Sequence, residues 1–244
     1  MDKKYAFVLS ILLTLIIFSN FFIFSAKENQ RESVIVSRVI DWDTLETENG
    51  YTIRLLNVNS PEKGTFHAQL SKDYLKSFEN KTIEIEIQGT DKYKRILARL
   101  YAPDYVNLEL VSQGLASKFL VDESELKTFA QAEEKAVQNS KGMWNKSLYY
   151  GCFSSDINKY QEFVILENHC EDTNMKGWVL KDESRKSYIF SSSFKSVILY
   201  SGLGEDNSTD LFIGSKTDIW NNDRDTLYLF DSGGNIVYHE AYGY

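Results

Sequence analysis

Hydrophobic and polar residues alternate in short runs from residue 34 onward, a pattern typical of strands with one buried face. The clearest run is Thr82–Ile87, in which every second residue is isoleucine. Asn49-Gly50 predicts a tight hairpin turn, so the strands before and after it should be antiparallel. The runs that predict strands in this part of the chain are Val34–Ile40, Leu45–Thr47, Thr52–Asn57, Thr82–Ile87 and Ile96–Tyr101.

Apolar residues at helical spacing predict three helices in the same part of the chain, His67–Phe78, Leu108–Gln113 and Glu125–Asn139. Gly114 and Gly142 are placed to end the last two helices. Five strands flanked by helices predict a small closed barrel of the OB type, which we assign to residues 33–147.

The pattern changes after this region to short apolar runs separated by turns, with no periodicity that predicts a helix. Such a series predicts an immunoglobulin-like β-sandwich, which we assign to residues 148–244. The whole fold should therefore be mainly β with some α. The runs are Phe163–Leu166, Gly177–Leu180, Tyr188–Phe190, Ser196–Tyr200, Asp210–Ile213, Thr226–Phe230 and Ile236–His239.

The N-terminal residues Tyr5–Phe24 form a mostly apolar run, long enough to cross a bilayer as a helix. Lys3 and Lys4 favour a cytoplasmic N-terminus, which leaves the bulk of the protein outside the cell. A cleaved signal peptide is the competing interpretation, although its apolar region is usually shorter. We expect a membrane anchor or signal peptide over residues 1–26 and a linker over residues 27–32. The protein would be single-pass at the cell membrane, or secreted if the segment is cleaved.

The chain carries a net charge of −8, which argues against binding nucleic acid by overall charge alone. Local basic residues or a bound cation would have to attract such a substrate. The two cysteines, Cys152 and Cys170, should form a disulfide in an oxidising exterior, and two buried free thiols are the alternative. Their spacing argues against a zinc site.

Polar clusters interrupt the predicted strands between Arg38 and Arg95. Carboxylate and amide oxygens bind hard cations, and a glutamate can take a proton from water. Guanidinium groups match two phosphate oxygens with paired donors. An isolated Asp-x-Asp is more often turn chemistry, but the ordered set predicts hydrolysis of a phosphodiester. The clusters are Asp41-Trp42-Asp43-Thr44, Arg54, Asn59-Ser60-Pro61-Glu62 and Asp91-Lys92-Tyr93-Lys94-Arg95.

These clusters, followed by Val106-Asn107-Leu108 and residues 110–116, resemble the staphylococcal nuclease (thermonuclease) family. The resemblance implies a calcium-dependent endonuclease or exonuclease of DNA or RNA on an OB barrel, and the N-terminal segment would place this nuclease outside the cell. It implies Asp43, Asn59 and the backbone carbonyl of Ser60 as calcium ligands. It also implies catalytic roles for Glu62, which would activate water, and for Arg54 and Arg95, which would stabilise the phosphate. Lys92 and Tyr93 would bind a neighbouring phosphate, although a solvated loop is an equal alternative for them.

Three positions depart from the pattern of that family. Trp42 and Lys94 stand where the family has glycine, and Asn59 stands where it has aspartate. Losing one negative ligand weakens cation binding, while an amide oxygen is still a legitimate ligand. Two hypotheses follow: an active nuclease, or a barrel with weak or no catalysis that binds nucleic acid or a surface partner.

The C-terminal region resembles the lamin-tail domain, an immunoglobulin-like sandwich with an interaction role and no catalytic residues. The sequence does not identify the partner of this domain. The residues that carry the resemblance are Glu162-Phe163-Val164, Gly177–Asp182, Gly202-Leu203-Gly204, Ile219–Asn222 and Asp225–Asp231.

Overall fold

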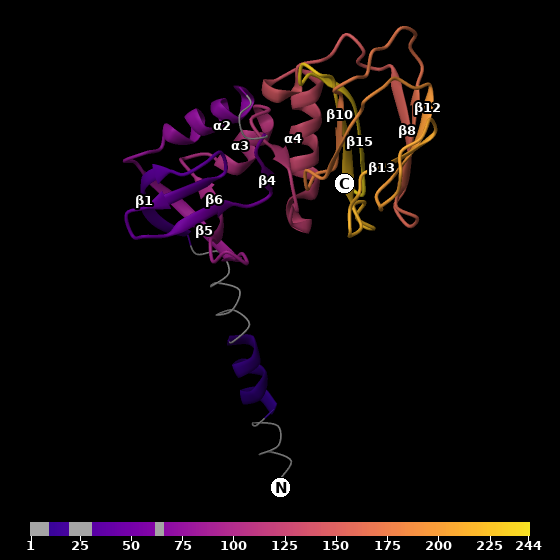
Figure 1. Cartoon of the computed structure of the whole chain (residues 1–244). Helices are drawn as coiled ribbons and strands as arrows, with labels where there is room; N and C mark the ends of the chain where they lie inside the picture. Colours follow the sequence, from indigo (N-terminus) through magenta and orange to yellow (C-terminus); the bar gives the residue numbers. More distant parts are fainter. Residues whose placement is uncertain (1–9, 20–30, 62–65) are drawn as a thin grey trace.

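The structure is a computed structural model that describes residues 10–19, 31–61 and 66–244. Three parts follow one another along the chain: a helix over residues 10–19, a β-barrel with helices, and a pair of β-sheets (Figure 1). The predicted fold class, mainly β with some α, is therefore confirmed.

Five strands close the barrel in the order β1-β2-β3-β6-β5, which confirms the predicted five-stranded barrel. Leu45, Ile53 and Ile85 are fully buried inside it, because alternate residues of each strand point to the core. The β3–β6 pair is parallel and the other pairs are antiparallel. The strands are β1 (Arg31–Val39), β2 (Thr44–Thr47), β3 (Thr52–Leu55), β5 (Thr82–Thr90) and β6 (Ile96–Tyr101).

The ends of α2, α3 and α4 lie within two residues of the predicted bounds, which is the usual uncertainty of helix ends. The predicted strand Thr52–Asn57 stops earlier, because Asn57 adopts a positive φ of 64° that turns the chain. Two short strands that the sequence did not predict, β4 (Val58–Asn59) and β7 (Ser117–Lys118), pair beyond that turn. The helical elements are α2 (Phe66–Lys76), α3 (Val106–Ser112), η1 (Glu123–Glu125), α4 (Leu126–Gln138) and η2 (Gly142–Trp144).

The C-terminal region forms two four-stranded sheets, ordered β11-β10-β14-β15 and β13-β12-β9-β8. Buried residues from both sheets, such as Leu166 and Leu229, share one core with Trp178 and Trp220. The two sheets therefore pack face to face as a sandwich. The strands are β8 (Phe153–Asn158), β9 (Phe163–Asn168), β10 (Val179–Lys181), β11 (Ser187–Ile189), β12 (Ser196–Tyr200), β13 (Asp210–Phe212), β14 (Asp225–Phe230) and β15 (Ile236–Tyr242).

A disulfide joins Cys152 and Cys170, whose Cα atoms are 5.4 Å apart, so the predicted pairing is confirmed. Cys152 directly precedes β8 and Cys170 follows β9. The bond therefore closes the open end of the first hairpin of the sandwich.

A third apolar cluster joins the barrel domain to the sandwich. Ala136 and Val137 of α4 and Trp144 of η2 pack there against β14 and β15, and the ring of Trp144 stacks on that of Tyr228 at 5.4 Å. Helix α4 accordingly lies between the barrel and the sheets (Figure 1). The two domains are docked through a shared core.

The N-terminal helix spans residues 10–19, and its side chains are exposed. The remaining residues of the predicted span, 5–9 and 20–24, lie outside the described part of the chain. None of the helices in the described residues combines the length and apolar character needed to cross a membrane. Strand β1 begins at Arg31, so the last two residues of the expected linker are strand.

Candidate functional site

A cavity of about 670 Å³ opens where one end of the barrel meets the sandwich. All but one of the predicted site residues of the barrel line it; the exception, Glu62, lies outside the described residues. Ser184 and Arg185, from the turn between β10 and β11 of the sandwich, line it as well. The predicted residues in the lining are Asp43, Arg54, Asn59, Ser60, Lys92, Tyr93 and Arg95.

The register of the barrel strands brings these residues together. Thr44 of β2 lies opposite Arg54 of β3, and Ile53 lies opposite Ile96 of the parallel strand β6. Arg95 directly precedes β6, and its Nη1 lies 3.3 Å from Thr44 Oγ1. Residues from three separate strands therefore meet at one end of the barrel.

Asp43 is buried in this cavity, and both of its carboxylate oxygens contact polar groups. Its Oδ2 lies 3.2 Å from Arg54 Nη2 and accepts a 2.8 Å hydrogen bond from Ser60 Oγ, and its Oδ1 accepts from Thr44 Oγ1 at 3.1 Å. Burial by itself would raise the pKa of Asp43, but the Arg54 charge and these hydrogen bonds outweigh it and lower that pKa. Asp43 is therefore a carboxylate at neutral pH.

Asp41 lies beside Asp43 and has the opposite pKa shift. Burial, and next the negative charge of Asp43, raise the pKa of Asp41 above its ordinary value. The Asp41 carboxylate also accepts the Asp43 backbone N–H at 3.2 Å. Two carboxylates thus share the acidic side of the cavity.

The guanidinium of Arg54 is held by protein oxygens. Besides pairing with Asp43, it donates to the backbone carbonyls of Leu55 and of Val58, the latter at 2.9 Å. Burial lowers the pKa of Arg54, Asp43 opposes that shift, and the positive charges of Arg95 and Arg185 lower the pKa further. Three guanidinium groups therefore gather in one cavity.

The loop that carries Lys92, Tyr93 and Arg95 is built around Asp91. The Asp91 carboxylate accepts the backbone N–H of Tyr93 at 2.9 Å and pairs with Arg95 Nε at 2.8 Å. Lys94 adopts a φ of 66°, so this lysine retains the left-handed conformation that glycine adopts more easily. Lys92 Nζ lies 5.1 Å from the centre of the exposed Tyr93 ring. The loop presents Arg95 and these two side chains to the cavity.

Asn59 faces the sandwich domain. Its Nδ2 donates to the backbone carbonyl of Glu183 at 3.0 Å, and its Oδ1 accepts a hydrogen bond from Arg185 Nη2. The side chain is buried, with 3% exposure. An amide can donate and accept at once, whereas a carboxylate can only accept.

The predicted calcium ligands do not fit a calcium ion in this arrangement. Calcium takes about six to eight oxygen ligands. The Asp43 oxygens are already engaged by Arg54, Ser60 and Thr44. The Asn59 side-chain oxygen accepts a hydrogen bond from the Arg185 guanidinium, whose positive charge repels a second cation. No group of three or more His, Cys, Asp or Glu residues suited to a metal occurs in residues 10–19, 31–61 and 66–244.

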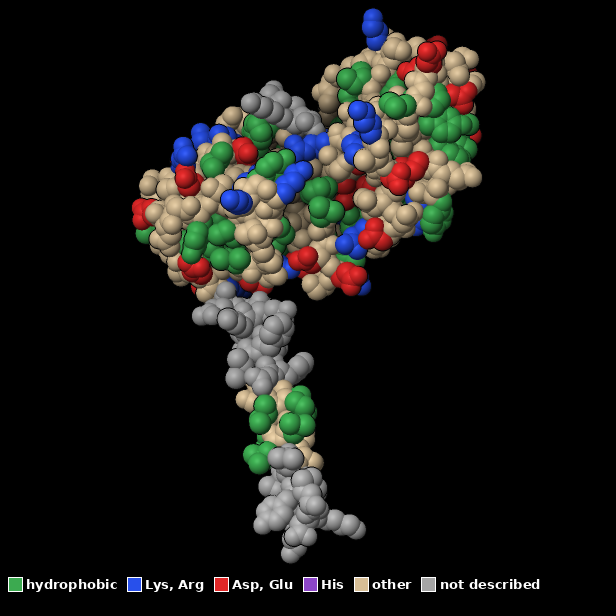
Figure 2. Space-filling view, turned by 60° about the horizontal axis from the view of Figure 1, so that its bottom comes forward, with side chains coloured by type: hydrophobic (Ala, Val, Ile, Leu, Met, Phe, Trp, Pro, Cys, Tyr) green, Lys and Arg blue, Asp and Glu red, His purple; other side chains and the backbone are tan. Residues whose placement is uncertain are grey.

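The cavity is locally basic within an acidic protein. Its described lining holds four basic residues, Arg54, Lys92, Arg95 and Arg185, and three acidic ones, Asp41, Asp43 and Asp91. Lys and Arg side chains gather over the barrel close to its junction with the sandwich (Figure 2). This local excess suits a phosphate group better than the overall charge of −8 suggests.

Sequence reasoning missed Arg185, which is 126 residues from its partner Asn59. The segment Asp182–Lys186 is recognisable only as a polar turn between two apolar runs. A turn signal does not show which distant surface the turn contacts. The anchoring role of Asp91 was also missed, although Asp at the start of a turn is a known local signal.

Comparison with known proteins gives matches over the barrel domain. Residues 52–146 match the family described as staphylococcal nuclease homologue. A protein of Escherichia coli named "Uncharacterized endonuclease" is 30% identical over 115 residues, which cover 45% of this chain and 75% of that protein. A protein of the same name from Escherichia coli O157:H7 is 29% identical over 115 residues, with the same shares of each chain.

Proposed function

Since the chain belongs to the staphylococcal nuclease homologue family, we propose that it is a nuclease that hydrolyses phosphodiester bonds of DNA or RNA. The observation that carries the proposal is the meeting of Arg54, Arg95 and Asp43 in one basic cavity. Convergent charged groups at strand ends rarely serve packing alone.

In the proposed reaction, a water molecule attacks phosphorus, the bond from phosphorus to the leaving oxygen breaks, and the leaving oxygen takes up a proton from solvent water. Glu62 takes the proton of the attacking water; this role rests on the resemblance, because Glu62 lies outside the described residues. Arg95 and Arg54 stabilise the negative charge that builds on the phosphate oxygens. Asp43 holds the Arg54 guanidinium in place, so this donor is oriented before substrate arrives.

The resemblance to the nuclease family also implies that the reaction depends on calcium. Asp41 and Asp43 both line the cavity, but the oxygens of Asp43 are already engaged by Arg54, Ser60 and Thr44, which opposes a cation there. The contact between Asn59 and Arg185 also opposes it, for the reason given above. We therefore assign no step of the reaction to a cation.

The same contact supports a second candidate function. A barrel whose Asn59 is bonded to another domain could bind nucleic acid without cutting it. Salt-dependent binding with no turnover would identify this function.

We propose that the enzyme works outside the cell, either tethered by residues 5–24 or secreted after their removal. Lys3, Lys4 and the apolar run support this location, and so does the disulfide, because such bonds persist in oxidising compartments. We propose an interaction role for the sandwich, on the strength of its resemblance to the lamin-tail domain.

The test uses the full chain and labelled single-stranded DNA, double-stranded DNA and RNA, each with calcium and with a chelator. We expect wild-type cleavage of at least one substrate and large losses in E62Q and R95A. R38A is the matched control, because Arg38 pairs with Glu46 on the barrel surface and does not line the cavity. Absence of cleavage in every condition, or full activity of E62Q, would reject the proposal.

A further inference from the structure

The turn between β10 and β11 enters the cavity of the barrel domain although it belongs to the sandwich. Ser184 and Arg185 of this turn line the cavity with the barrel residues. The Arg185 side chain is half-buried and donates to Asn59 Oδ1. The sandwich thus supplies one of the three guanidinium groups of the site.

The turn is built to hold Arg185 in an unfavourable backbone conformation. Arg185 has a φ of 73°, in the left-handed region that favours glycine. Asp182 fixes the turn, since its Oδ1 accepts Lys186 N at 2.7 Å and its Oδ2 accepts Ser184 Oγ at 2.6 Å. Strain of this kind persists only where the surroundings over-determine it, and it concentrates at functional sites.

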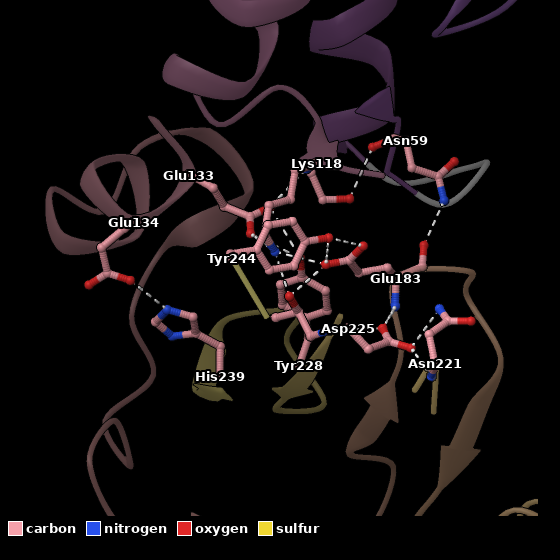
Figure 3. Close-up of polar contacts among 12 residues, drawn as sticks. Asn59, Lys118, Glu133, Glu134, Glu183, Asn221, Asp225, Tyr228, His239 and Tyr244 are labelled. Atoms are coloured by element: carbon pink, nitrogen blue, oxygen red, sulfur yellow. Dashed lines mark hydrogen bonds and ion pairs between the residues drawn. The ribbon is translucent and has the colours of Figure 1, made fainter. Parts of the chain in front are cut away.

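Glu183 ties the same turn to the barrel domain (Figure 3). Its buried carboxylate lies 2.8 Å from Lys118 Nζ and accepts hydrogen bonds from Tyr244 OH at 2.7 Å and Thr226 Oγ1 at 2.6 Å. Its backbone carbonyl accepts the Asn59 amide. Glu183, which directly precedes Ser184 and Arg185, is therefore fixed at both its backbone and its side chain.

The charge of Arg185 is not neutralised by its direct partner. Asn59 is a neutral amide, and among the described residues no carboxylate lies within ion-pair distance of Arg185. Its charge is near enough to act on Asp43 and to oppose that of Arg54. Arg54 is paired with Asp43 and Arg95 with Asp91, so among the described residues Arg185 is the guanidinium of the cavity that lacks a carboxylate partner.

We propose that Arg185 binds a phosphate group of the nucleic-acid substrate, so that the sandwich domain completes the substrate site of the barrel domain. This inference rests on the proposed nuclease function. A guanidinium offers paired donors that match two phosphate oxygens, and only one of its nitrogens is needed for Asn59. The docked sandwich is then part of the substrate site.

The test measures cleavage of a labelled single-stranded oligonucleotide by the full chain over a series of salt concentrations. R185A should raise KM by about tenfold with a smaller change in kcat, because it removes a charge-assisted contact. It should also reduce the slope of log KM against log salt by about 0.7, as expected for one lost phosphate contact on a single strand. R185K should restore the slope but not all of the affinity.

The matched control is R224A. Arg224 Nη2 donates to Val121 O at 2.9 Å across the same domain junction, but Arg224 does not line the cavity. R224A should keep the wild-type KM and slope. R185G, which tolerates a positive φ, should behave as R185A and covers the case in which the alanine variant folds poorly.

Three outcomes would overturn the inference. An R185A or R185G enzyme with wild-type KM and salt slope shows that Arg185 does not bind substrate. An equal loss in R224A shows that domain docking, rather than a phosphate contact, controls KM. A wild-type protein that does not cleave the oligonucleotide rejects the nuclease function itself and this inference with it, a result distinct from the other two.

Discussion

Lys118 is the buried cation at the junction of the two domains. Its side chain is 1% exposed, and Nζ lies 2.9 Å from Glu133 Oε2 of the barrel domain and 2.8 Å from Glu183 Oε1 of the sandwich. The ring of Tyr244 covers it, with the ring centre 4.1 Å from Nζ (Figure 3). One ammonium therefore compensates two buried carboxylates that come from different domains.

K118M should destabilise the protein strongly. Methionine fills a similar volume without charge, so the variant leaves Glu133 and Glu183 buried without a counter-charge. Removing one partner of a buried ion pair costs about 3–5 kcal/mol. For a chain of this size, each kcal/mol lowers Tm by about 2–4 °C, so differential scanning calorimetry should show a fall of roughly 6–20 °C.

Two further variants separate charge from packing. The triple variant K118M/E133Q/E183Q removes all three charges and should recover most of the lost stability, because replacing a whole buried ionic cluster is often neutral. K127M changes an exposed lysine of α4 and should leave Tm unchanged. A K118M protein with a wild-type Tm would refute the reasoning, and a triple variant as unstable as K118M would assign the loss to packing.

Three more predictions follow from the sandwich and from the contact between Asn59 and Arg185. Burial and a neighbouring carboxylate raise the pKa of Asp225 from 3.8 to about 7. Because the folded-state pKa of Asp225 exceeds its unfolded value, the stabilising contribution of this group is complete below pH 3.8 and is lost as pH rises through about 7. Urea titrations at a series of pH values should show this fall in the free energy of unfolding. D225N should flatten that dependence. Reducing the disulfide between Cys152 and Cys170, which are 18 residues apart, should cost about 3 kcal/mol in chemical denaturation, and a loss below 1 kcal/mol would contradict the estimate. Calorimetric titration should show tighter calcium binding by N59D/R185Q than by wild type, because the double variant gains a carboxylate and loses a competing cation; equal affinities would count against this account of the site.

The barrel could be predicted because its signals are local. Strict alternation in Thr82–Ile87 gave one strand, and the Asn49-Gly50 turn gave a hairpin. Strand β8 was missed because Ser154, Ser155 and Asp156 follow one another in it, and a strand at the edge of a sheet can carry more polar residues. The two-residue strands β4 and β7 are too short to give a period.

The candidate site was predicted only as far as the barrel contributes to it. Asp43, Arg54 and Arg95 belong to motifs that follow strand ends, and the strand register then brings them together. The partners of Asn59 lie 124 and 126 residues away along the chain, in Glu183 and Arg185. Contacts between domains depend on the complementarity of two folded surfaces, and no local sequence pattern encodes that complementarity.

The docked sandwich accounts for the departure from the family at position 59. An aspartate there would place a carboxylate oxygen against the carbonyl oxygen of Glu183, where the Asn59 amide now donates. It would also form a buried ion pair with Arg185 in place of a hydrogen bond to a neutral amide, and so neutralise a guanidinium that faces the cavity. Asparagine satisfies both neighbours and leaves the Arg185 charge uncompensated. The amide at position 59 and the arginine at position 185 are therefore two parts of one contact, which links the cavity of the barrel domain to the second domain.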